Sequence, residues 1–270
     1  MKKYDLIYIN GCSFTYGHGV PSTKAWPHLL GKKFDKEILN DSKNGNSMDT
    51  IVTRTIQQVL SLKGKTFYVI GLTWPGRYGF HIDDVMFNWS LSESKFPLPN
   101  GDSKVGVSKS TQLMGNISNH DMRKIYSDKV CEIINSYSEY AKKKITFDKK
   151  FLLNENLIYI RKILELQNFL KVQNIDYIFV NFNNMLFEDL LDSKIIELFV
   201  NQLDVSKIID LKNYFVQMKF FNFLDTKFKF YDNEYEVASR RHTEYTKLNN
   251  HPTERGHEQI CEKVYDFINR

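Results

Sequence analysis

A serine lies directly after an apolar run near the start of the chain. Residues 9–17 read INGCSFTYG, and Ser13 follows the apolar residues at 4–10 by three positions. A serine hydroxyl attacks a carbonyl carbon when a neighbouring base removes its proton and when hydrogen-bond donors hold the oxyanion that forms. Ser13 is therefore a candidate nucleophile. The alternative is a serine that caps the helix after it.

A candidate base lies near the other end of the chain. The imidazole of His251 can accept a proton near neutral pH and return it to a leaving group. Because a residue before proline favours extended backbone, His251 is expected on the connection into a terminal helix over 252–268, with Pro252 at the first helical position. His257 would lie inside that helix in a structural role, and His18 is expected at the rim of the site.

Apolar patterning predicts alternating strands and helices. The expected strands are 4–10, 37–41, 66–72, 175–182 and 227–232. The expected helices are 24–34 (interrupted near Pro27 and Gly31), 48–60, 126–144, 155–172 and 186–223, and residues 79–125 show no sustained period. Such alternation favours a parallel sheet covered on both faces, which binds ligands at the carboxyl ends of its strands. The loops after the first three strands are therefore expected to form the site.

Four short segments in these loops and before the last helix resemble, in order, the sequence blocks of the SGNH (GDSL-like) hydrolase superfamily. They are GCSFT at 11–15, NGNS at 44–47, GLT at 71–73 and NHPTERGH at 250–257, and WPHLL at 26–30 is similar to the segment after the first block. The resemblance implies a flavodoxin-like three-layer α/β/α fold with about five parallel strands. It also implies a serine esterase that acts on acyl groups of sugars, lipids or small alcohols, with no metal or organic cofactor.

The resemblance assigns roles to individual residues. Ser13 matches the nucleophile and His251 the base, so the sequence supports a Ser-His dyad. The backbone N–H groups of Ser13 and Gly45 match two donors of the oxyanion hole. Thr73 stands where the family has a third donor, an asparagine. Either Thr73, Asn46 or another group is expected to fill that place, or the activity is expected to be low.

Two further positions depart from the family pattern. Leu248 stands where the family has the aspartate that orients the histidine, and Asn249 and Asn250 are not carboxylates. A backbone carbonyl or a carboxylate such as Glu244 is the expected substitute. Cys12 replaces the aspartate of the GDS motif and is expected to be a buried structural thiol.

Substrate contacts are expected from the segment TWPGRY at 73–78. The rings of Trp74 and Tyr78 suit stacking on a sugar face, and Arg77 suits pairing with a carboxylate or a phosphate. Asn46 is a fourth candidate for substrate binding. The alternative for Trp74 and Tyr78 is that they anchor the loop to the core.

Composition narrows the class of protein. The chain has 270 residues, a net charge of +5 from scattered basic residues, and three cysteines far apart in sequence. The length predicts a single domain over 1–270, in which residues 79–150 form a lid or an insertion. The cysteines predict that the protein is located in the cytoplasm. No nucleic-acid partner and no membrane span are expected. The expected partner is a small acyl ester, and the oligomeric state is left open.

These observations predict a serine esterase that removes an acyl group, with acetyl the expected one, from a carbohydrate or similar small substrate. The same acyl-enzyme would also permit acyl transfer to a sugar hydroxyl. A third alternative is a ligand-binding module with impaired catalysis, which Thr73 and Leu248 keep open.

Overall fold

The computed structural model describes the chain with several gaps. It describes residues 1, 3–18, 20–73, 77–82, 85–92, 106–113, 149–182, 194–211, 237–239, 248–252 and 254–270. Of these, the side chains of 78–82, 85–92, 106–113, 149–155, 237–239 and 248–251 are not described. In these ranges, none of the helices has the length and apolar character needed to cross a membrane.

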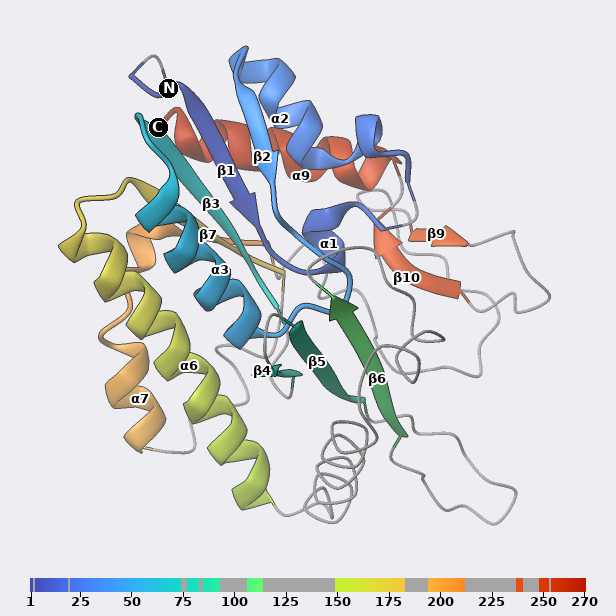
Figure 1. The fold of residues 1–270 in the computed structure, drawn as a ribbon, viewed down its shortest axis with the longest axis vertical. Helices are drawn as coiled ribbons and strands as arrows, with labels where there is room; N and C mark the ends of the chain where they lie inside the picture. The colour runs from blue at the N-terminus through green and yellow to red at the C-terminus, as the bar shows by residue number, and fades with distance from the viewer. Residues whose placement is uncertain are drawn as a thin grey trace.

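A five-stranded, all-parallel sheet lies at the centre of the molecule (Figure 1). Its strands lie in the order β2-β1-β3-β7-β8. Their bounds are Leu6–Asn10 for β1, Glu37–Asn40 for β2, Thr66–Leu72 for β3, Tyr177–Asn181 for β7 and Ile208–Asp210 for β8. Every residue of the central strand β3 is buried, as expected for a strand covered on both faces, whereas the edge strand β2 is largely exposed.

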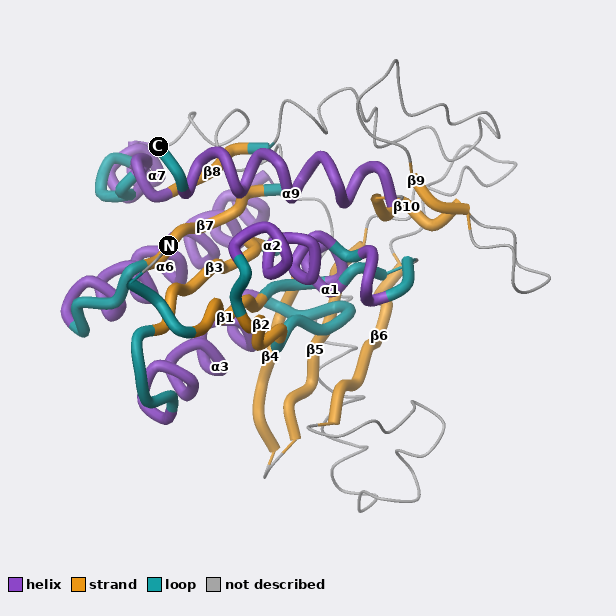
Figure 2. The backbone as a smooth tube through the Cα atoms, turned by 90° about the horizontal axis from the view of Figure 1, so that it is seen from above, coloured by secondary structure: helices purple, strands orange, loops and turns teal. Residues whose placement is uncertain are grey.

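Helices cover both faces of this sheet. Helices α1 (Ser13–Tyr16), α2 (Trp26–Phe34) and α9 (Glu254–Ile268) pack on one face, and α3 (Met48–Ser61), α6 (Lys149–Val172) and α7 (Lys194–Val200) pack on the other. Each face has its own apolar core, and Figure 2 shows the layers from above. The predicted three-layer α/β/α architecture is therefore confirmed.

The paired helices α2 and α9 show how the sequence produces this packing. In α9 the buried residues Ile260, Cys261 and Val264 recur at helical spacing, and in α2 the buried residues are Trp26 and Leu30. An apolar stripe of this kind buries itself against a sheet and leaves the opposite face in water. The two helices contact each other as well as the sheet. Pro27 lies in the first turn of α2, where no backbone donor is lost, and α2 continues without interruption through Gly31.

One expectation about helices was wrong. Residues 186–223 were expected to be helical, but α7 ends at Val200, a short 3-10 helix follows over Val205–Lys207, and β8 supplies the fifth strand of the sheet. Only three residues pair in β8, which is too short for a periodic pattern to reveal. The strand expected at 227–232 and the helix expected at 126–144 lie outside the described residues.

Part of the segment without a sustained period forms a second sheet. Strands β4 (Arg77–Ile82), β5 (Val85–Ser92) and β6 (Gly106–Leu113) pair antiparallel in that order. Figure 2 shows them side by side below the main sheet. In β5, residues 87–92 (FNWSLS) alternate apolar and polar side chains, which is a strand pattern over a short stretch. In β6 (GVSKSTQL) most side chains are polar or absent, so that strand carries little signal, because the pairing itself needs only the backbone.

The approach to the last helix also differs from expectation. Strand β10 (Leu248–Pro252) pairs antiparallel with β9 (Val237–Ser239), and α9 begins at Glu254. Pro252 therefore ends a strand and is not the first residue of the helix. The extended backbone expected at His251 is present, since His251 lies within β10.

Close packing against glycine fixes the position of α1. A Cβ atom on Gly71, in β3, would overlap Oγ1 of Thr15 in α1 and would come within 3.2 Å of Cε2 of Phe182. Only glycine allows α1 to lie this close to the end of β3. The Thr15 hydroxyl is buried and has no hydrogen-bond partner among the described residues.

This packing makes a double-mutant prediction. Gly71→Ala is expected to lower the free energy of unfolding by about 1–3 kcal/mol, because it overpacks this contact. Thr15→Ala removes the overlapped hydroxyl, so it is expected to recover much of the loss when combined with Gly71→Ala. Urea denaturation of the four proteins measures the coupling. Strictly additive effects would show that the two residues do not clash.

Candidate active site

Ser13 lies at the carboxyl edge of the parallel sheet, just after strand β1. It is the first residue of α1, three positions after the end of β1, and 5% of its surface is exposed. Its carbonyl accepts hydrogen bonds of 3.1 Å from the N–H groups of Gly17 and His18. Within the described part of the chain, neither its hydroxyl nor its N–H has a hydrogen-bond partner. Cys12 occupies the cap position of α1, so Ser13 is not the helix cap.

Gly45 forms the turn that follows β2. Its φ of 78° is left-handed, a conformation that favours glycine over residues with a Cβ. Its N–H has no hydrogen-bond partner among the residues that the structure describes. Two backbone donors, one on Gly45 and one on Ser13, are thus available at the carboxyl edge of neighbouring strands.

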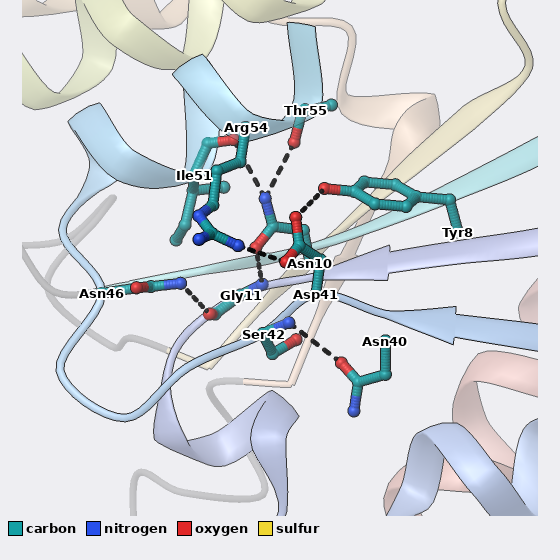
Figure 3. Close-up of polar contacts among 10 residues, drawn as sticks. All are labelled: Tyr8, Asn10, Gly11, Asn40, Asp41, Ser42, Asn46, Ile51, Arg54 and Thr55. Carbon is teal, nitrogen blue, oxygen red and sulfur yellow. Dashed lines mark hydrogen bonds and ion pairs between the residues drawn. The ribbon is translucent and has the colours of Figure 1, made fainter. Parts of the chain in front are cut away.

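One carbonyl joins these two turns. The Gly11 oxygen accepts a 2.9 Å hydrogen bond from Nδ2 of Asn46 (Figure 3). It also accepts a 3.2 Å bond from the Lys43 N–H. Gly11 precedes Ser13 by two residues, and Gly45 lies between the two donors. The Ser13 turn is therefore held directly against the Gly45 turn. Asn46 is fully buried, so its amide group braces the two turns and is not an exposed substrate contact.

A partly buried charge pair anchors the start of the same loop. The Asp41 carboxylate accepts hydrogen bonds from Arg54 of α3 and, at 3.3 Å, from the Tyr8 hydroxyl of β1 (Figure 3). The Asp41 N–H donates to the Ile9 carbonyl at 2.8 Å. The Asp41 and Arg54 side chains are only 16% and 13% exposed. Burial and the Asp41 charge raise the pKa of Tyr8, which keeps the phenol a neutral donor.

Asn10 holds the end of β1. Its Nδ2 donates to the Ile51 carbonyl and to Thr55 Oγ1, each at 3.1 Å, and its Oδ1 accepts from the Gly11 N–H at 2.8 Å. Sequence reasoning assigned no role to Asn10, Asp41 or Arg54. The one available signal was the asparagine at the end of a strand predicted to be buried. A buried polar side chain needs hydrogen-bond partners, so Asn10 could have been expected to bind a neighbouring element.

Thr73 is arranged differently from a third oxyanion donor. Its hydroxyl donates to the Asn46 carbonyl at 3.0 Å and accepts from Nη1 of Arg77 at 2.9 Å. A hydroxyl has one proton, so the proton of Thr73 points toward Asn46 in this structure. The Thr73 carbonyl accepts a hydrogen bond from the buried Tyr159 hydroxyl of α6. Thr73 therefore fixes the Gly45 turn to the end of β3.

For the candidate base, His251, the structure describes the backbone only. The His251 side chain lies outside the described residues, as do Trp74, the Tyr78 side chain, Glu244 and the side chains of 248–250. Strand β10, which carries His251, has Cα atoms within 8 Å of those of α1, which carries Ser13. The backbones of the two elements are thus neighbours.

Two other expectations concern histidine and cysteine side chains. Nδ1 of His18 lies 2.8 Å from Nδ2 of Asn44, so it joins the loop after α1 to the loop after β2. The Cys12 thiol is free and fully buried, as expected for a structural thiol. Cys261 is likewise buried in α9, and burial raises its pKa to about 12.

His257 stabilises the start of α2. Its Nδ1 accepts a 3.3 Å hydrogen bond from the Trp26 N–H, which assigns the imidazole proton to Nε2. Nε1 of Trp26 in turn donates to the Phe14 carbonyl at 3.1 Å, which connects this contact to α1. The side chain of His257 is fully buried, and burial lowers its pKa to about 4. The structural role expected for His257 is therefore the one observed.

Comparisons with known proteins were made by sequence and by structure. No protein-family model matches the chain, and no curated protein matches it. Among solved structures, it is similar to the psychrotrophic esterase EstA from Pseudoalteromonas sp. (11% identity, TM-score 0.44, 98% of this chain and 97% of that one).

Two more of these structures have similar scores. One is a member of the lipolytic protein G-D-S-L family from Veillonella parvula DSM 2008, with 10% identity, a TM-score of 0.44 and 98% of both chains covered. The other is the acetyl xylan esterase AlAXEase, with 14% identity, a TM-score of 0.44, and 97% of this chain and 98% of that one covered.

The neutral His257 predicts an acid-dependent loss of stability. Unfolding returns its pKa from about 4 to the ordinary value of 6.5, so the unfolded state binds a proton that the folded state does not. His257 therefore destabilises the fold as pH falls from 6.5 to 4, by about 1.4 kcal/mol per pH unit. Above pH 6.5 it makes no pH-dependent contribution.

Urea denaturation of His257→Gln between pH 4 and 7.5 measures this contribution. The variant is expected to lose less stability than the wild type as pH falls. His28→Gln, which replaces an exposed histidine of α2, is expected to keep the wild-type slope. Equal slopes for His257→Gln and the wild type would contradict the neutral buried imidazole.

Proposed function

We propose that the protein is a serine ester hydrolase that removes an acyl group, acetyl in the first instance, from a carbohydrate or similar small substrate. Ser13 is the nucleophile and His251 is the general base and acid. The N–H groups of Ser13 and Gly45 hold the oxyanion. The alcohol class follows from the aromatic residues Trp74 and Tyr78 expected beside the site, whose rings suit a sugar face.

One observation carries this proposal. The Gly11 carbonyl ties the Ser13 turn to the Gly45 turn, while the hydroxyl and N–H of Ser13 and the N–H of Gly45 have no partner among the described residues. Buried or half-buried donors without partners are uncommon in folded proteins unless a ligand satisfies them. Two such donors and a nucleophilic hydroxyl at one sheet edge are the parts that acyl transfer requires.

The reaction follows from these groups. Ser13 Oγ attacks the ester carbonyl carbon as the imidazole of His251 takes the hydroxyl proton, and the carbonyl electron pair moves onto oxygen. The two N–H donors stabilise that oxyanion. Collapse breaks the bond to the alcohol, which leaves with the proton from His251. Water then attacks the acyl-Ser13 ester with His251 again as base, and the carboxylic acid departs.

A binding module with impaired catalysis is the second candidate. It is favoured by the Thr73 hydroxyl, whose proton is directed at Asn46, and by Leu248 in place of a carboxylate beside His251. Removal of one oxyanion donor lowers kcat by roughly a hundredfold to a thousandfold. This candidate binds the same ligands but forms no covalent intermediate.

Labelling with a fluorophosphonate distinguishes the two candidates. Ser13 is expected to attack phosphorus and displace fluoride, which gives one adduct per chain in intact-mass analysis. Ser13→Ala is expected to give none, and His251→Ala is expected to slow labelling strongly because the hydroxyl keeps its proton. Ser206→Ala, which removes an exposed serine, is the matched control. A folded wild type without an adduct would favour the binding module.

A further inference from the structure

The proposed nucleophile and base lie on segments that are far apart in the sequence. Ser13 begins α1, whereas His251 lies in β10, shortly before α9 begins at Glu254. A base takes a hydroxyl proton only when the two groups are within hydrogen-bond reach. Contacts that hold α1 against α9 are therefore candidates for positioning the reaction.

Trp26 binds both of these segments, one through each of its nitrogens. It is the first residue of α2, a helix that contacts both α1 and α9 (Figure 2). Its backbone N–H donates to Nδ1 of His257, in the first turn of α9, at 3.3 Å. Its indole Nε1 donates to the carbonyl of Phe14, the residue after Ser13, at 3.1 Å. One residue thus connects the turn that carries Ser13 to the helix that follows His251.

Each of the two bonds satisfies a group that its own helix leaves unpaired. The first N–H groups and the last carbonyl groups of a helix have no partner inside it. Ala25, at the cap position of α2, makes no side-chain cap, and His257 supplies the missing acceptor. The Trp26 ring does the same for the carbonyl end of α1.

Burial makes these bonds costly to break. Trp26 and His257 are fully buried, and Phe14 is 4% exposed, so both bonds are shielded from water. A buried polar group that loses its partner costs about 1–3 kcal/mol. The pair of bonds therefore resists movement of α1 relative to α9.

A surface contact joins the same two segments and serves as a comparison. Lys24, which precedes α2, forms a 3.5 Å ion pair with Glu254 at the start of α9. The two side chains are about half exposed, at 49% and 50%. Exposed ion pairs of this kind contribute little, because water screens them.

We propose that Trp26, held by His257, is a positioning residue that sets Ser13 within reach of His251. The inference rests on the proposed function and extends it to two residues that do not take part in the chemistry themselves. A misplacement of reacting groups by about 1 Å can lower a rate roughly a hundredfold. The loss falls on proton transfer, so kcat is expected to decrease while KM stays nearly unchanged.

Variants of both residues test this role. The measurements are the rate of Ser13 phosphonylation by a fluorophosphonate and the kcat and KM for p-nitrophenyl acetate. Trp26→Phe keeps an aromatic ring but removes the Nε1 donor, and His257→Leu removes the acceptor. Each is expected to lower the phosphonylation rate and kcat by roughly tenfold to a hundredfold.

A conservative change at His257 is expected to restore the rate. In asparagine the oxygen Oδ1 is bonded to Cγ, as Nδ1 is in histidine, and it accepts hydrogen bonds. His257→Asn is therefore expected to recover most of the activity that His257→Leu loses. Equal losses in the two variants would overturn the inference, because the hydrogen bond to Trp26 would then be irrelevant to the rate.

A double-mutant cycle with His251→Ala separates positioning from a general disturbance of the site. A change that acts through the alignment of Ser13 with His251 has nothing left to disturb once the imidazole is absent. Trp26→Phe is therefore expected to leave the residual labelling rate of His251→Ala unchanged. The same fold loss with and without His251 would overturn the inference.

Two control variants complete the test. Lys24→Met breaks the exposed ion pair and is expected to match the wild type. Leu30→Ala removes buried packing from α2 but neither bond of Trp26, so it is expected to lower Tm and keep the labelling rate of the folded protein. Circular dichroism verifies that each variant is folded.

The outcomes distinguish this inference from the proposed function. A loss of labelling in Leu30→Ala as large as that in Trp26→Phe would overturn the inference, because packing alone would explain both. Wild-type rates in Trp26→Phe and His257→Leu would overturn it while leaving the proposed function in place. A folded wild type that is not labelled would overturn both.

Discussion

The two hydrogen bonds to the Gly11 carbonyl are the contacts on which the site depends. A carbonyl oxygen has two lone pairs, and here one accepts from the Lys43 backbone and the other from the Asn46 side chain. A hydrogen bond contributes about 1 kcal/mol net, but a buried donor left without a partner costs about 1–3 kcal/mol. The buried Asn46 amide therefore resists separation of the two turns, which keeps Ser13 and Gly45 in a fixed relation.

The parallel sheet makes this contact possible and surrounds it with rigid supports. Strands β1, β2 and β3 are neighbours, so the turns that follow them meet at one edge. Asn10 and the Asp41–Arg54 pair tie these turns to α3, and His257 ties α2 to α9 behind α1. The polar groups of the site are thus held by contacts from both covering layers of helices, a pre-organised arrangement that suits oxyanion stabilisation.

Local sequence patterns predicted the parts of the site that depend on a single turn. The positions of Ser13, after one apolar strand, and of Gly45, after a second strand, follow from the short segments in which they lie. The structure places both residues at the sheet edge. The direction of the Thr73 proton was not predictable, because it depends on how two turns from different strands approach each other. For the same reason, nothing in the sequence indicated the ion pair that Arg54 of α3 makes with Asp41 in the loop before that helix.

The strands and helices of the fold also divide into those that a single segment predicts and those that depend on contacts with distant segments. The central strands were predictable because continuous apolar runs such as TFYVIGL are typical of buried strands. Strand β8 pairs over three residues only, and β6 is polar over most of its length, so their pairing emerges only from the neighbours available in three dimensions. His257 could be placed in a helix from its segment, whereas its bond to Trp26 joins residues 231 positions apart.

The central claim is that one oxyanion site is formed jointly by the Ser13 and Gly45 turns. A crystal structure of the protein with Ser13 phosphonylated tests it most directly, because the phosphonyl oxygen occupies the place of the oxyanion. The account predicts that this oxygen lies about 2.7–3.1 Å from the backbone nitrogens of both Ser13 and Gly45. An adduct whose oxygen contacts neither nitrogen, or contacts Ser13 while the Gly45 turn has moved away from Gly11, would contradict it.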